Sequence, residues 1–241
     1  MTRHIRHALQ AISLVTLLGA GAPAQAADPV TEAIQAANGP YRMALYKTNG
    51  PSQAEAQQAL TQAQQAWDKL GTQFGAKPAA PYDRDPAFAA SVAAVSKVYN
   101  KALAEVNAND NKAAHNTLEE AREIMADMRH RNNVVAFSDH MNAYHSQMEV
   151  IMIDGNATLA QPKGLLQMTA QTGALSFLAK RLTTQAPESL TKNAEFTALV
   201  EAVNKSVAGL EAACLNQDMA AVKEAISKLK GPYSKLFSKF G

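Results

Sequence analysis

The sequence contains little of what folds outside the all-helical class require. Aromatic residues make up only 6% of the chain, and β-branched residues rarely alternate with polar ones, so we expect no strands. The single cysteine, Cys214, excludes a disulfide within the chain. Its largely apolar setting between Leu210 and Leu215 predicts a buried, unreactive thiol. The absence of a sufficiently long apolar run predicts that no segment spans a membrane.

An excess of charge of one sign is also missing. The chain has 23 basic and 21 acidic residues, and loss of Arg3 and Arg6 with a leader peptide leaves 21 of each. A neutral chain without a concentrated basic face matches the phosphates of nucleic acid poorly. We therefore exclude nucleic acid as a partner. A metal ion and a second protein, from the periplasm if the chain is exported, remain as alternative partners.

Residues 1–26 have the pattern of a signal peptide. Arg3 and Arg6 precede a short apolar stretch, residues 8–22, and Ala24-Gln25-Ala26 forms an A-x-A cleavage site. The sequence therefore predicts cleavage after Ala26 and export to the periplasm. The oligomeric state stays open.

Alanine, glutamine, lysine and leucine dominate the remaining chain and favour helices. Glycine, proline and capping residues divide it into eight predicted helices: about 30–48, 53–74, 86–107, 110–130, 134–153 and 164–184, then one ending near Leu215 and one that Asp218 begins. The fifth is expected to end at Asp154-Gly155. No glycine or proline separates the fourth helix from the fifth, so these two are expected to run together and to couple the two halves rigidly.

Two stretches of the sequence repeat at an offset of 108 residues. The pattern Phe88-x-Ala90-x-Val92-x-Ala94-Val95-x-Lys97 recurs ungapped as Phe196-x-Ala198-x-Val200-x-Ala202-Val203-x-Lys205. The same offset pairs Asp110 with Asp218, Ala113 with Ala221, Leu118 with Ile226, Met125 with Tyr233 and Met128 with Leu236. At the first helix of each half, Asn49-Gly50 matches Asp154-Gly155 only after a three-residue slip. The repeat predicts an all-α fold of two tandem up-down-up-down four-helix bundles, residues 27–132 and 133–241.

The last helical hairpin resembles the end of a cytochrome c′-type four-helix bundle. In that family an acidic cap starts the final helix, and a C-x-x-C-H haem attachment followed by an aromatic residue ends it. Here Asp218 starts the helix, Phe240 falls at the terminal aromatic, and the haem positions hold Tyr233, Leu236 and Phe237. The equivalent residues of the first half are Met125, Met128 and Arg129. The resemblance implies the bundle fold, but both thiols and the imidazole are missing, which argues against a covalent haem and haem-based electron transfer.

The fifth predicted helix carries a stripe of methionine and histidine. Spacings of three and four residues place one set of side chains on a single face: Phe137, Met141, His145, Met148 and Met152. Thioether sulfur and imidazole suit Cu(I) in an oxidising compartment. One hypothesis is therefore a copper site of His145 with Met141, Met148 or Met152, completed by Met125 and Met128 if the fourth and fifth helices pack together. A b-type haem held between a methionine and His145 is a variant of this hypothesis.

The competing interpretation of this stripe is a hydrophobic core. Any bundle helix needs an apolar face, and methionine commonly fills gaps in cores. A lone histidine on such a face is more often a hydrogen-bonded core residue than a metal ligand. The stripe alone does not separate the two interpretations, although His145 is polar where an apolar residue is expected.

Other charged residues are interpreted as surface features. The cluster Arg129-His130-Arg131 is expected to interact with the C-terminal dipole of the fourth helix. His115, next to Asn116, is predicted to be solvated. The nearby Glu119, Glu120 and Arg122 are predicted to form a solvated, ion-paired face.

No catalytic motif is present in the sequence. It contains no G-x-S-x-G, no H-E-x-x-H and no phosphate-binding glycine loop. We therefore expect an exported, non-enzymatic binding or interaction protein, with the copper-binding protein and an enzyme with a site between the two bundles as alternatives. A deep pocket between the two bundles, lined by ionisable groups with shifted pKa values, would favour the enzyme. A shallow groove would favour the binding role.

Overall fold

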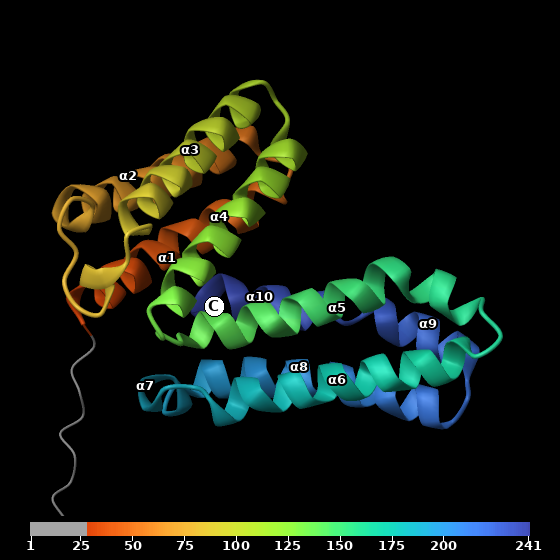
Figure 1. Cartoon of the computed structure of the whole chain (residues 1–241). Helices are drawn as coiled ribbons and strands as arrows, with labels where there is room; N and C mark the ends of the chain where they lie inside the picture. Colours follow the sequence, from red (N-terminus) through yellow and green to blue (C-terminus); the bar gives the residue numbers. More distant parts are fainter. Residues whose placement is uncertain (1–27) are drawn as a thin grey trace, which may run out of the picture.

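The computed structural model describes residues 28–241, and every regular element in that range is a helix. Figure 1 shows two elongated groups of helices whose long axes cross at an angle, one from each half of the chain. The prediction of an all-α fold is confirmed. Within residues 28–241, no helix has both the length and the apolar character needed to cross a membrane. The predicted signal peptide lies outside the described residues.

The first helix group consists of α1 (Pro29–Thr48), α2 (Gln53–Phe74), α3 (Phe88–Asn107) and α4 (Asn111–Arg131), with the short 3-10 helix η1 (Tyr82–Arg84) before α3. Apolar side chains from these helices form one core. Inside it, the Trp67 indole donates to the Val92 carbonyl at 2.9 Å, which satisfies its only polar atom. Side-chain caps begin three of the four helices, from Asp28, Ser52 and Asp110.

The second helix group consists of α5 (Phe137–Leu159), α6 (Gly164–Thr184), the short α7 (Glu188–Thr191), α8 (Ala194–Leu215), α9 (Met219–Ser227) and α10 (Lys230–Phe240). These helices form a second core. Asp218 caps α9 as expected, but the predicted last helix is divided into α9 and α10 near Leu229. Cys214 is buried in this core, with its sulfur 3.8 Å from the Thr172 hydroxyl. The prediction of a buried thiol is confirmed.

Helix α10 joins the two groups. It packs on α5 and α8 of its own group and also contacts α1 of the other, and Phe237 packs against both cores. Two polar side chains of α1 reach the end of this segment. Asn38 donates to the Gly241 carbonyl at 3.1 Å, and Arg42 donates to the Lys239 carbonyl at 3.2 Å. The interface between the groups therefore has apolar and hydrogen-bonded parts.

Helices α4 and α5 do not run together, which corrects the sequence prediction. Between their ends Asn133 has a left-handed backbone (φ 57°), a conformation that asparagine tolerates better than most residues. The Asp139 carboxylate accepts the Ala136 backbone N–H at 2.7 Å and so starts α5. The same carboxylate pairs with Arg129 of α4. The chain therefore turns without glycine or proline, and an ion pair links the two helices across the turn.

Helix α5 continues to Leu159, beyond its predicted end at Asp154-Gly155. A Cβ on Gly155 would lie 3.2 Å from Ile226 Cδ1 and 3.3 Å from Met168 Cε. Glycine is used here for close packing against α9 and α6, and it does not end the helix. The proposed match of Asn49-Gly50 with Asp154-Gly155 is wrong, because only the first pair follows the end of its helix.

Positions related by the 108-residue offset have matching environments. Both members are buried in the pairs Phe88/Phe196, Val92/Val200, Val95/Val203, Val106/Cys214, Ala114/Val222, Ala121/Leu229, Met125/Tyr233 and Met128/Leu236. Asp110 and Asp218 each accept a backbone N–H three residues later, at 2.9 and 3.0 Å. The residues before these caps, Asn109 and Gln217, both have positive φ, 62° and 55°. The buried positions, the caps and the turns before them therefore repeat, although the single helix α4 corresponds to the two helices α9 and α10.

Candidate ligand-binding site between the helix groups

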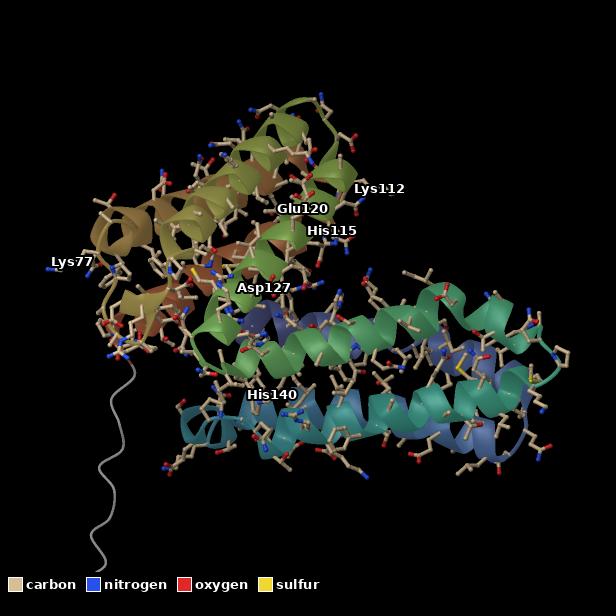
Figure 2. The ribbon with its side chains drawn as sticks, viewed as in Figure 1. Lys77, Lys112, His115, Glu120, Asp127 and His140 are labelled. Carbon is tan, nitrogen blue, oxygen red and sulfur yellow. The ribbon has the colours of Figure 1, made fainter. Side chains whose placement is uncertain are left out.

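Four helices from both groups enclose a small cavity at their interface. Its volume is about 60 Å³, and we call it the interface cavity; it is lined by Leu45, Tyr46 and Asn49 of the α1 end, His115, Glu119 and Arg122 of α4, His145, Met148 and Glu149 of α5, and Lys230, Tyr233, Ser234 and Phe237 of α10. An open groove of about 710 Å³ adjoins it and shares the side chains of His115, Glu119, Glu149 and Lys230. In Figure 2, His115 lies on the side of α4 that faces the second helix group.

Helical spacing brings the lining residues of each helix to one face. On α4, His115, Glu119 and Arg122 are separated by four and three residues, which places them one turn apart along the same side. The lining residues of α5 and α10 also recur at spacings of three and four. Because the helix groups cross at an angle, these faces converge only near the crossing. The site therefore depends on both halves of the chain.

His145 is the most unusual residue of the interface cavity. Its side chain is 12% exposed, and neither ring nitrogen has a hydrogen-bond partner in the described part of the chain. Nε2 lies 3.3 Å from Glu149 Oε1, but the angles are not those of a hydrogen bond. Burial, with Arg122 and Lys230 nearby, lowers the pKa of His145 to about 3. At neutral pH the ring is therefore uncharged, with one donor and one acceptor nitrogen available.

His115 faces the same cavity from α4. Its Nδ1 lies 3.1 Å from the Leu45 carbonyl, an acceptor, so Nδ1 carries the proton and Nε2 keeps a lone pair. That Nε2 lies 3.8 Å from Glu119 Oε1. Burial lowers the pKa of His115, although the bond to Leu45 opposes this shift. The prediction that His115 is a solvated surface residue is wrong, because it packs against the end of α1 and is only 26% exposed.

The charged residues of α4 are also partly buried. Arg122 pairs with Glu119 and, more loosely, with Glu123 at 3.4 Å. Burial raises the pKa of Glu119, and the neighbouring Arg122 only partly offsets this effect. A raised carboxyl pKa in a cavity lined by two neutral histidines is typical of functional sites, although structural ion-pair networks also produce it. The predicted ion pairing of this face is confirmed. Its predicted solvation is wrong for Glu119 and Arg122, which are partly buried.

Aromatic rings form the wall behind His145. The Tyr233 ring stacks on the imidazole with centroids 5.3 Å apart, and Phe237 stacks on Tyr233 at 5.8 Å. The Tyr233 hydroxyl donates to the Met141 carbonyl at 3.2 Å, which fixes the ring. Tyr233 is buried, and burial raises its pKa well above the ordinary tyrosine range. This wall holds the His145 ring in a defined orientation.

The methionine and histidine residues of the copper hypothesis lie in several places. His145 and Met148 line the interface cavity together. Met141 is buried in the second core and Met152 packs against it, whereas Met125 and Met128 belong to the first core. The structure therefore brings two of the six residues to one cavity. Within residues 28–241, no group of three or more His, Cys, Asp or Glu side chains is arranged to hold a metal ion.

The positions aligned with the haem motif are occupied by core residues. Tyr233 and Leu236 are buried, and Phe237 lies at the junction of the two cores. In the first half, Met125 and Met128 are buried, and Arg129 pairs with Asp139.

Arg131 likewise pairs with Asp85 at 3.0 Å. The arginines that were assigned to the helix dipole therefore also hold neighbouring segments through ion pairs.

Sequence reasoning missed five ionisable residues of the cavity: His115, Glu119, Arg122, Glu149 and Lys230. One signal was available, because a histidine precedes a glutamate by four residues in both α4 (His115 and Glu119) and α5 (His145 and Glu149). Such a pair on two helices indicates faces with the same chemistry. Lys230 had no comparable signal.

Comparison with protein-family models, with curated proteins and with solved structures finds no match to this chain. The function is therefore inferred from the geometry of the interface cavity.

Proposed function

We propose that this chain is an exported, periplasmic, non-enzymatic binding protein that holds a small ligand in the interface cavity. The observation that carries the proposal is His145, whose two ring nitrogens are buried without a partner on the cavity wall. Both nitrogens face a space in which a ligand group can donate to or accept from the imidazole.

We also propose that the two helix groups are tandem up-down-up-down four-helix bundles, residues 27–132 and 133–241, of cytochrome c′-like topology without covalent haem. Support comes from the buried pairs, the paired caps and the paired positive φ values at the 108-residue offset. Superposition of residues 88–128 on residues 196–236 of an experimental structure tests this proposal. Helical hairpins that differ in crossing geometry would contradict it.

An enzyme is the alternative that the ionisable groups favour. The unprotonated Nε2 of His115 beside Glu119 has the character of a general base. The enclosed volume of about 60 Å³ is small, however, next to the 300–1,000 Å³ of ordinary ligand pockets. A substrate would lie mostly in the open groove, where water is not excluded. We therefore prefer binding over catalysis.

Copper binding is the second candidate, favoured by the shared position of His145 and Met148 on the cavity wall. A neutral imidazole next to a thioether suits Cu(I). The test is anaerobic titration of the protein with Cu(I) against a competing chelator, for the wild type and for Met148→Leu. Tight Cu(I) binding by the wild type that Met148→Leu loses supports the candidate. Met152→Leu is the control, and we expect it to bind Cu(I) as tightly as the wild type. Micromolar or weaker binding by the wild type contradicts it.

Thermal unfolding with a panel of small amines, carboxylates, amino acids and sugars tests the main proposal. A compound at about 100 times its Kd stabilises the folded chain by about 2.7 kcal/mol, which raises Tm by roughly 5–10 °C for a chain of this size. His145→Phe keeps the ring that stacks on Tyr233 and removes both nitrogens, so we expect it to lose the response. His140→Phe, on the same helix but outside the cavity lining, is the matched control. A response that both variants retain contradicts the proposal.

A further inference from the structure

The charged side chains of the interface cavity balance one another. Arg122 and Lys230 are cationic, and Glu119 and Glu149 are anionic. His115 and His145 add no charge at neutral pH, because burial lowers the pKa of both. A cavity of this kind does not favour a ligand with net charge of either sign. It favours a neutral ligand that carries complementary charges of its own.

Only two of these four charges are free to meet a ligand. Arg122 and Glu119 pair with each other inside the cavity wall. Lys230 has no ion-pair partner within residues 28–241, and the contact of Glu149 is with the uncharged His145. Glu149 is 47% exposed at the mouth, where both side chains also line the adjoining groove. Lys230 and Glu149 thus stand at one opening without pairing with each other.

Neutral hydrogen-bonding groups extend the two charges into the cavity. The Nε2 lone pair of His115 lies 3.8 Å from Glu119 Oε1 and can accept from an ammonium group, although Lys230 acts on this ring more strongly than Glu149 does. The field of Arg122 and Lys230 at His145 is positive, which suits a carboxylate that accepts from the imidazole. The exposed ring of Tyr46 at the rim and the ring of Phe237 add aromatic surface that attracts cations.

The size of the cavity limits the ligand to a compact molecule. A volume of about 60 Å³ is far below the 300–1,000 Å³ of ordinary ligand pockets. A larger group has to lie in the adjoining groove, beside Asn49, Asn116 and Ile153.

Resting on the proposed function, we infer that the interface cavity binds a small zwitterion, with its ammonium group at Glu149 and His115 and its carboxylate at Lys230 and His145. A free α-amino acid with a short side chain has this chemistry. Binding would join the two charges that the protein leaves apart at the cavity mouth. It would also connect α4 of one helix group with α5 and α10 of the other.

Isothermal titration calorimetry of the protein at pH 7 tests the inference with three matched ligands. Alanine carries both charges, propionate lacks the ammonium group and ethylamine lacks the carboxylate. We expect alanine to bind at least about tenfold more tightly than either single ion, because one charge-assisted hydrogen bond contributes about 1.5–3 kcal/mol. Lys230→Gln should clearly reduce the preference for alanine over ethylamine, and Glu149→Gln should clearly reduce the preference for alanine over propionate. Lys228→Gln and Glu224→Gln, which pair with each other outside the lining, should retain the wild-type preference.

This loss of discrimination separates a ligand contact from a merely structural role, which would weaken all three ligands together. Propionate or ethylamine binding as tightly as alanine overturns the zwitterion inference and leaves the proposed function standing. No binding of any of the three also overturns the inference. A different result contradicts the proposed function: a His145→Phe variant whose Tm responds to every compound of the wider panel as the wild type does.

Discussion

Arg129, in the last turn of α4, pairs with Asp139, in the first turn of α5, and both side chains are nearly inaccessible to solvent, at 5% and 8% exposed. Asp139 at the same time accepts the Ala136 backbone N–H. A single carboxylate thus starts one helix and binds the end of the previous one. It therefore links the last helix of the first group to the first helix of the second group.

Removing one partner of this ion pair is expected to destabilise the chain strongly. Arg129→Met leaves the Asp139 charge buried with one partner fewer, which typically costs about 3–5 kcal/mol. The measurement is the free energy of unfolding in urea. Lys101→Met removes an exposed pair with Glu105 and Glu120, so a change within about 0.5 kcal/mol is expected for this control. Equal losses for the two variants would show that Arg129 contributes no more than a surface pair.

The positive-φ residues before the two aspartate caps, Asn109 and Gln217, are expected to respond differently to glycine. Gln217→Gly relieves a left-handed conformation that costs an ordinary residue about 1–2 kcal/mol, partly offset by the flexibility that glycine adds to the unfolded chain. Asn109→Gly should gain less, because asparagine tolerates this conformation. Thermal unfolding of both variants measures the difference. A larger gain at position 109 would contradict the argument.

Mid-helix glycines give a further contrast. A Cβ on Gly173 or Gly209 meets nothing within 4 Å, so replacement of either by alanine should stabilise its helix by about 0.5–1 kcal/mol. At Gly155 the space is filled by Ile226 and Met168. Gly155→Leu should therefore destabilise the chain by about 1–3 kcal/mol through overpacking. Calorimetric melting of the three variants measures these changes in stability. A Gly155→Leu variant as stable as the wild type would refute the close packing at this position.

The buried His145 is expected to make stability depend on pH. Its pKa falls from 6.5 in the unfolded chain to about 3 in the folded one, so the unfolded chain binds the extra proton between these values. Its contribution is complete above pH 6.5 and is lost as the pH falls toward 3. Between pH 7 and pH 5 the loss is about 2 kcal/mol, at 1.36 kcal/mol per pKa unit. His115 shifts in the same direction, whereas the raised pKa of Glu119 acts in the opposite one.

Urea unfolding of His145→Gln at pH 7 and pH 5 checks this prediction. Glutamine keeps polar atoms in the cavity but does not titrate, so the variant should lose clearly less stability on acidification than the wild type. The same pH dependence in the variant and the wild type would mean that His145 does not titrate as its burial implies.

The sequence by itself determined most of the helices and their caps. Asp110 and Asp218 were identifiable because a capping side chain bonds to backbone only three residues away. Many residues related by the 108-residue offset are buried in both copies, because burial on a helix follows its periodicity. These features depend on interactions within one or two turns, which the order of residues specifies directly.

The tertiary structure decided the site. His115 has the local pattern of a solvated residue and is partly buried because α1 packs against α4. Lys230 reaches the cavity because α10 crosses from the second helix group to the first. Gly155 marks an expected helix end, yet close packing against α6 and α9 keeps it helical. In each case the partner lies far away in sequence, and the free energy of burial against that partner overrides the local preference.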